Sequence, residues 1–289
     1  MKGKKKPAGI KHRIREKKKR ERRIALAIII AILIIIVSAS GFFINSMLNK
    51  PSPDHSSNTS TSEPKAAIAD HLSLTAPNQT FIQTATNTLE QAGYTVDYYP
   101  GEDITVGFYR DLPKHNYGII ILRVHSTAAE LQGQEYVETP VCLFTSENYT
   151  TTKYLYEQLY DQIVGVSYTV PEPPFYFGIM PKFVTSSMSG RFQDTAIIMM
   201  GCEGLNNTKM AEAFIQKGAK VYIGWRGAVS ASRTDQATAQ LLQHLIMEKQ
   251  TIKQAVTETM NDVGPDLIHD TVLLYDPPEA EEYVIPDVP

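Results

Sequence analysis

The stretch that decides the fold is Asp194–Gly204, which reads DTAIIMMGCEG. Its apolar run, Ala196–Met200, is typical of a strand that is buried on both faces in a mostly parallel sheet. Gly201 and Gly204 then allow a sharp turn as the chain leaves the sheet. Cys202 lies in this turn, so we expect its thiol at the carboxyl edge of the sheet, where open α/β folds bind their ligands.

A second apolar run, Tyr117–Val124, ends on His125 in the same way. Helical spacing over 80–92 and 209–217 alternates with the strand patterns, which favours parallel α/β units. Neighbouring parallel strands would bring the side chains of His125 and Cys202 to the same sheet edge. The interval between the two residues is long, and we expect it to hold an inserted hairpin and helix.

A thiol beside an imidazole can carry out nucleophilic catalysis. The thiolate attacks, and the imidazole takes its proton or stabilises it as an ion pair. Backbone N–H groups at Ser126 and Gly201, in the turns after the two strands, would bind the developing oxyanion. This combination favours peptide-bond hydrolysis, with His125 and Cys202 as catalytic residues and no metal or organic cofactor. On spacing alone, a structural role for both residues stays open.

Two segments resemble the caspase-like cysteine peptidases. Tyr117–Ser126 is similar to their strand and histidine. Residues 194–226 are similar to the gingipain and CHAT branch, because a strand runs into GCEG and is followed by the helix MAEAFI and then by KGAKVYIGW. The resemblance covers about 70–262. It implies a caspase-haemoglobinase fold, a three-layer α/β sandwich with a mainly parallel central sheet, in which His125 is the general base or acid and Cys202 the nucleophile.

The chain departs from this family at two positions. Ser126 follows the histidine where the family has Gly, and Gly201 precedes the cysteine where the family has a small residue such as Ala. A glycine after the histidine lets the backbone approach the substrate carbonyl, so Ser126 bears directly on the oxyanion hole. A catalytically inactive surface module for binding or adhesion is therefore the alternative to a peptidase.

Four residues are candidates for a substrate pocket. Trp225 and Arg226 end the strand after the cysteine strand, and Arg226 could pair with an acidic substrate side chain. Glu203 and Asp235 could instead form an acidic pocket for Lys or Arg. Arg123, two residues before the histidine, is either a buried ion-pair partner or an edge residue that faces solvent.

The other cysteine and three further histidines give weaker signals. Cys142 falls within an expected strand, 139–144, where small buried cysteines are common. A disulfide with Cys202 is the alternative if the domain is exported. The further histidines show no metal-ligand spacing, so we expect surface positions and predict no metal site: His115, His244 and His269.

The N-terminal part predicts a membrane anchor. The chain has 289 residues and a net charge of −3, but the charge is unevenly distributed. Residues 1–23 hold 13 of its 28 Lys and Arg residues. The rest of the chain has 15 basic and 29 acidic residues, which gives it a net charge of −14. Residues 24–44 are apolar and uncharged, and their length matches the hydrocarbon core of a bilayer. This basic arm would stay in the cytoplasm and place the C-terminal domain outside. A signal peptide cleaved near 38–40 is the alternative.

Composition also sets the domain boundaries. Residues 45–69 are rich in Pro, Ser and Thr and predict a flexible stalk, 70–276 the caspase-like ectodomain, and 277–289 a loose, acidic, Pro-rich tail. No basic patch with interleaved aromatics occurs outside the arm, so we expect a peptide or protein substrate and no nucleic acid. Four glycosylation sequons agree with export: Asn58, Asn78, Asn148 and Asn206.

Overall fold

The computed structural model describes residues 64–128, 139–168 and 173–287, all within the unit Ser62–Pro289. The predicted basic arm, the transmembrane helix 24–44 and most of the predicted stalk lie outside the described residues. Within the described ranges, no helix is long and apolar enough to cross a membrane.

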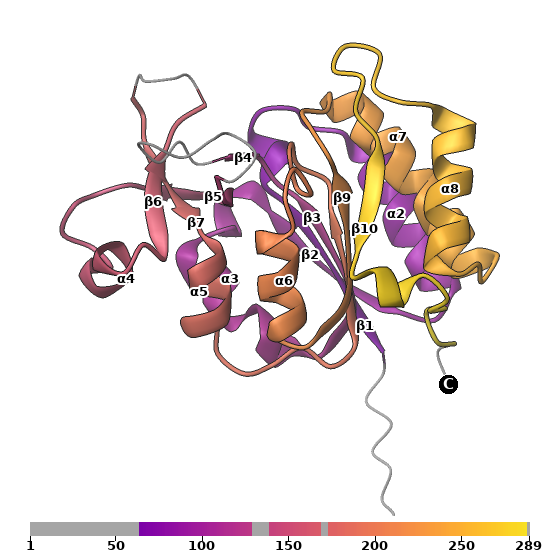
Figure 1. Cartoon of the computed structure of the whole chain (residues 1–289), viewed down its shortest axis with the longest axis horizontal. Coiled ribbons are helices and arrows are strands. Elements are labelled where there is room, and N and C mark those ends of the chain that lie inside the picture. The colour runs from indigo at the N-terminus through magenta and orange to yellow at the C-terminus, as the bar shows by residue number, and fades with distance from the viewer. Residues whose placement is uncertain (1–63, 129–138, 169–172, 288–289) are drawn as a thin grey trace, which may run out of the picture. The chain divides into compact units, whose positions relative to one another are not determined.

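A six-stranded sheet in the order β10-β9-β8-β3-β1-β2 forms the centre of the fold (Figure 1). Five of its strands run parallel, and β10 (Leu273–Asp276) runs antiparallel beside β9. The parallel strands are β1 (Lys65–Asp70), β2 (Thr95–Pro100), β3 (Tyr117–Arg123), β8 (Thr195–Met199) and β9 (Ala219–Trp225). The prediction of an α/β fold with a mainly parallel central sheet is confirmed.

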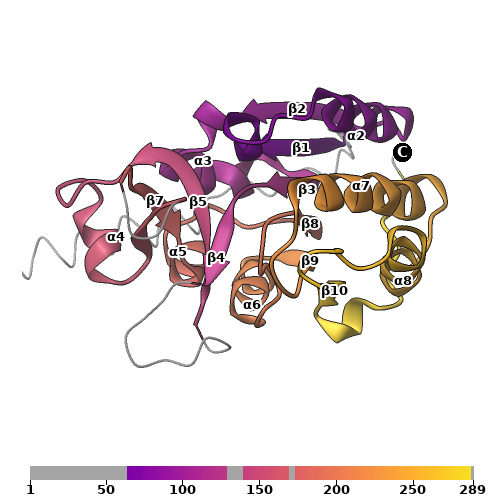
Figure 2. The ribbon, with the colours of Figure 1, turned by 90° about the horizontal axis from the view of Figure 1, so that it is seen from above.

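Both faces of the central sheet are covered, because alternate strand residues enter two separate hydrophobic cores. On one face, Ile119 and Ile121 belong to the core that also holds helices α2 (Gln79–Gln91), α7 (Ala231–Leu242) and α8 (Ile252–Val263). On the other face, Ile120 and Leu122 belong to the core that includes α3 (Val106–Asp111), α5 (Pro181–Ser186) and α6 (Lys209–Gln216). Figure 2 shows α6 and α7 on opposite sides of β8. This double burial explains why the strands read as continuous apolar runs.

The chain between β3 and β8 forms a second, antiparallel sheet in the order β4-β5-β7-β6. Its strands are β4 (Ser126–Ala128), β5 (Val141–Asn148), β6 (Ile163–Val166) and β7 (Tyr176–Ile179). The expected inserted hairpin is present as β6 and β7, and α5 follows it. This part of the chain also contains α4 (Leu155–Leu159), which stays short because none of its side chains is buried and no packing extends it.

Two predicted boundaries are wrong. The stalk was expected to reach residue 69, but β1 begins at Lys65, and Ala66–Ala69 are fully buried between β2 and β3. Three of these four residues are alanines with little apolar area, so their place in the sheet depends on pairing with strands on both sides. The C-terminal tail is also packed rather than loose: Ile285 is buried, and the Tyr283 carbonyl accepts a 2.9 Å hydrogen bond from the Ile252 N–H.

Candidate active site

The carboxyl ends of β1, β3 and β8 surround a small pocket. In the sheet β1 lies between β2 and β3, so the chain proceeds in opposite directions after β1 and after β3. Open α/β sheets bind ligands at such a switch point. The expected adjacency of the histidine and cysteine strands is confirmed, because β3 pairs with β8 in parallel. The pocket has a volume of about 80 Å³, and its lining includes both side chains: Leu72, Val124, His125, Met200, Gly201, Cys202, Val229, Ala231 and Thr234.

The Cys202 thiol is half-buried and held by the backbone of Val229. Its Sγ donates to the Val229 carbonyl at 3.5 Å and accepts from the Val229 N–H at 3.4 Å. Burial raises the pKa of this thiol, and the carboxylates of Glu203 and Asp266 raise it further, against the opposing effect of the Val229 amide. The resting group is therefore a thiol that needs a base to become a nucleophile.

The His125 imidazole is enclosed by other side chains. Its ring centroid lies 4.9 Å from that of Tyr168 and 5.8 Å from that of His71. Its Nε2 shares a 2.8 Å hydrogen bond with the Thr75 hydroxyl. In the tautomer whose Nε2–H donates to this hydroxyl, Nδ1 is unprotonated and can accept a proton. Burial lowers the pKa of His125 to about 4, and the nearby Arg123 guanidinium adds to this effect. The imidazole is thus neutral at pH 7, as a general base must be.

The two turns that carry His125 and Cys202 pack directly against each other. The Ser126 hydroxyl donates to the Cys202 carbonyl at 2.5 Å. A Cβ atom at Gly201 would lie 2.3 Å from both the Ser126 Oγ and the Val124 carbonyl oxygen, so only glycine fits before the cysteine. Gly201 itself lines the pocket between these two turns. Glycine at this position is therefore a steric requirement in this chain.

None of the four predicted substrate-pocket residues lines the pocket. Trp225 is fully buried, and its indole N–H donates to the Thr234 hydroxyl at 2.9 Å, so it is a core residue. The Glu203 carboxylate accepts a 2.5 Å hydrogen bond from the Ala128 N–H of the second sheet. Arg226 is exposed at the end of β9.

Asp235 does not contact the pocket because it belongs to a buried ion cluster with Arg123. The guanidinium donates to the Asp235 carboxylate through Nε and Nη2, at 2.7 and 2.8 Å. It donates to Asp70 through Nη1 at 2.7 Å and to the Ala76 carbonyl through Nη2 at 2.8 Å. The cluster ties the ends of β1 and β3 to α7. Of the two roles left open for Arg123, the buried ion-pair partner is the observed one.

Sequence reasoning missed four residues around the imidazole and the ion cluster: Asp70, His71, Thr75 and Tyr168. Asp70 ends β1, and His71 and Thr75 follow it. The short Ala-rich run of β1 borders a Pro- and Ser-rich segment and therefore resembles a stalk. Tyr168 follows β6, and no local period relates it to the central sheet. One signal was present, since Asp70 and His71 come after an apolar run just as His125 comes after β3.

The two cysteines do not form the alternative disulfide. Both thiols are free, and Cys142 is fully buried in β5, where burial raises the pKa of its thiol to about 12. The sequons differ in their surroundings. Asn78 caps α2 and its Nδ2 donates to Asp235 at 2.9 Å, so a glycan there would disturb the ion cluster, whereas Asn148 is exposed.

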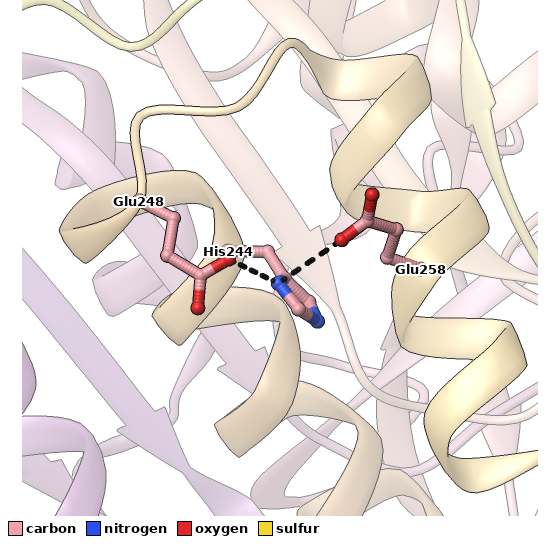
Figure 3. A group of neighbouring side chains, drawn as sticks. All are labelled: His244, Glu248 and Glu258. Atoms are coloured by element: carbon pink, nitrogen blue, oxygen red, sulfur yellow. Dashed lines mark hydrogen bonds and ion pairs between the residues drawn. The ribbon is translucent and has the colours of Figure 1, made fainter.

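A group of possible metal ligands lies between α7 and α8. Ligand atoms of His244, Glu248 and Glu258 lie within 4.8 Å of one another (Figure 3). The His244 Nδ1 is 2.9 Å from Glu248, and its Nε2 is 3.0 Å from Asp262. Burial lowers the pKa of His244, but the hydrogen bonds to Glu248 and Asp262 outweigh it and raise the pKa overall. These distances describe an imidazolium held by carboxylates. His244 is only 7% exposed, so its expected surface position is wrong.

Comparison with protein-family models and with curated proteins finds no match to this chain.

Proposed function

We propose that this chain is a membrane-anchored, extracytoplasmic cysteine peptidase of the caspase-like type, which hydrolyses peptide bonds with Cys202 and His125. The observation that carries the proposal is that both side chains line one pocket at the carboxyl ends of adjacent parallel strands. The resemblance of 194–226 to the gingipain and CHAT branch supports it. Helix packing on both faces of the central sheet is also what a three-layer caspase-haemoglobinase sandwich requires.

The reaction begins when the Cys202 thiol gives its proton to the neutral His125 imidazole and the sulfur attacks the carbonyl carbon of the peptide bond. The carbonyl oxygen becomes an oxyanion, to which the Gly201 N–H donates. The imidazolium then protonates the leaving amine as the C–N bond breaks, and a thioester remains. Water, deprotonated by the same imidazole, hydrolyses the thioester and restores the thiol.

The charges around the pocket favour base-assisted attack over a preformed thiolate–imidazolium pair. The pKa of the Cys202 thiol is raised and that of His125 is lowered to about 4, so both groups are neutral at pH 7. We therefore expect the rate of Cys202 modification to rise with pH across the neutral and alkaline range.

The test uses the full-length protein, a thiol-directed label and a peptide library. The wild-type protein should be labelled at Cys202 and should cleave peptides, and Cys202→Ala should do neither. Cys142→Ala is the matched control, because it removes the other, buried thiol and should keep both properties. Equal cleavage by wild type and Cys202→Ala would show that Cys202 is not the nucleophile.

A non-catalytic binding or adhesion module on the same fold is the second candidate. It is favoured by the pocket volume of about 80 Å³, which is small beside the roughly 300–1,000 Å³ of typical ligand sites. This function predicts an unreactive Cys202 and a glycan on Asn206, which would crowd the pocket. Mass spectrometry of the peptide that contains both residues measures label and glycan together, and so separates the two functions.

The anchoring part of the proposal rests on the uncharged apolar segment 24–44. Wild-type protein should stay in the membrane pellet after alkaline carbonate extraction, and a variant that lacks 24–44 should be released into the supernatant. Recovery of both proteins in the supernatant would contradict the anchor without affecting the peptidase.

A further inference from the structure

We propose that Tyr168 is a positioning residue for His125 and that His71 holds the Tyr168 hydroxyl, so that the inserted antiparallel sheet orients the imidazole beside Cys202. This inference rests on the proposed Cys202–His125 pair. Neither Tyr168 nor His71 lines the pocket.

The rings of His125, His71 and Tyr168 all contact one another. Tyr168 meets His125 with ring centroids 4.9 Å apart and an interplanar angle of 61°, and His71 meets it at 5.8 Å and 89°. His71 and Tyr168 stack on each other at 6.0 Å and 28°. Edge-to-face and offset contacts are the favoured geometries of such rings. Because two different rings touch the imidazole, it cannot turn without displacing one of them.

A single hydrogen bond fixes the position of the Tyr168 ring. Its hydroxyl and the His71 Nε2 are 2.9 Å apart. His71 is fully buried, and among the described residues its Nδ1 has no hydrogen-bond partner. The nearby Thr145 backbone tends to raise the pKa of His71, but this effect is the smaller one. Burial and the neighbouring His125 lower the pKa of His71 to about 4, so the ring stays neutral. This hydrogen bond is thus the side-chain contact through which His71 holds the Tyr168 ring.

The inserted sheet supplies the other contacts of Tyr168. Phe144 of β5 lies 5.5 Å from Tyr168 and 6.0 Å from His125, measured between ring centroids, and Tyr176 of β7 lies 5.1 Å from Tyr168. Tyr168 therefore transmits the position of the inserted sheet to His125, while His71 ties it to the end of β1. Together with the Thr75 hydroxyl on Nε2, these contacts set the direction of the His125 Nδ1.

Removing the Tyr168 hydroxyl should free the imidazole without emptying the ring cluster. Tyr168→Phe keeps the ring but leaves both nitrogens of the buried His71 without a side-chain partner. The rings can then shift, and His125 samples orientations that do not meet the thiol. Small misplacements of a catalytic group lower rates by as much as about 100-fold. We expect the His125-dependent rate of Cys202 alkylation to fall about tenfold.

The experiment measures Cys202 alkylation by iodoacetamide against pH in the full-length protein, with thermal unfolding of each variant. His125→Ala defines the rate without the base. Tyr168→Phe should move the pH–rate profile toward that of His125→Ala, and His71→Phe, which keeps a ring but breaks the same hydrogen bond, should do likewise. Tyr176→Phe is the matched control, because it removes a hydroxyl from the same cluster at a ring that contacts neither histidine; it should keep the wild-type profile.

The outcomes separate the inference from the proposed function. If His125→Ala changes the profile while Tyr168→Phe and His71→Phe keep the wild-type profile, the positioning role is wrong and the Cys202–His125 pair stands. A lower melting temperature with an unchanged profile in the folded protein also overturns the positioning role, since Tyr168 would then act only on stability. If His125→Ala leaves the profile unchanged, the pair itself does not act and the proposed function fails.

Discussion

Replacing Arg123 by methionine should strongly destabilise the protein, because it leaves two buried carboxylates without a cation. The Arg123, Asp70 and Asp235 side chains are 0%, 1% and 5% exposed. The substitution removes four hydrogen bonds of 2.7–2.8 Å from the guanidinium. Methionine is also long and unbranched and fills irregular space well, so the loss should come from charge rather than from a cavity.

The size of the effect follows from the number of partners. Removing one member of a buried ion pair costs about 3–5 kcal/mol. Since one guanidinium serves two carboxylates here, we expect about 5 kcal/mol at pH 7, a large part of the roughly 5–15 kcal/mol that stabilises a typical domain.

Urea unfolding of the full-length protein at pH 7 measures this loss. Trp225 is the single tryptophan of the chain and is fully buried, so its fluorescence reports unfolding of the core. Adding Asp70→Asn and Asp235→Asn to Arg123→Met should restore part of the stability at pH 7, because no buried charge remains. A loss below about 1 kcal/mol at pH 7, or no recovery of stability in the triple variant, would refute the argument from buried charge.

Three further predictions concern single positions. Gly201→Ala should cost about 3 kcal/mol in urea unfolding, because its Cβ would lie 2.3 Å from the Val124 carbonyl oxygen. Gly118→Ala is the control, because its Cβ would meet its nearest atom, Tyr94 Cε1, at an ordinary 3.5 Å; it should cost less than about 1 kcal/mol, and equal costs would contradict the steric argument. Thr75→Val should slow Cys202 alkylation about tenfold with little change in the urea midpoint, because Thr75 is exposed and its hydroxyl holds the His125 ring; a wild-type rate would show that the hydroxyl does not orient the ring. His244 has a pKa raised above its ordinary value of about 6.5, so its contribution to stability is complete below that pH and is lost as the pH rises through the raised pKa. The melting temperature should fall over that range in wild type and change less in His244→Gln, and parallel curves would count against the imidazolium.

The strands that carry His125 and Cys202 could be predicted because their signal is local. Each strand is buried on both faces, so every residue of Ile119–Leu122 and Ala196–Met199 had to be apolar. Their neighbouring position also followed from the preference of such runs for parallel pairing. The predicted pocket residues could not be assigned correctly in this way. Trp225 ends a strand and Asp235 lies on a helix, and neither position indicates whether the side chain faces a pocket or the core.

The first strand, β1, could not be recognised in the same way. Its residues Ala66–Ala69 are as buried as those of β3, but three of the four are alanines, and a short run of small side chains beside a Pro-rich segment carries a weak apolar signal. The strand is an interior strand of the sheet because β2 and β3 pair with it on both sides, and that pairing is a property of the assembled sheet.

For the site, the amino-acid sequence by itself determined that an imidazole and a thiol follow two doubly buried strands, because uninterrupted apolar runs between turn residues leave no other place for them. Only the tertiary structure decided what surrounds these groups. His71, His125 and Tyr168 meet because β1 pairs with β3 and the inserted sheet lies against them. These contacts join residues 43 to 97 positions apart, a separation that no local period encodes. The Asp194–Gly204 stretch thus specifies where the Cys202 thiol lies, and the packing of distant segments specifies its neighbours and its protonation state.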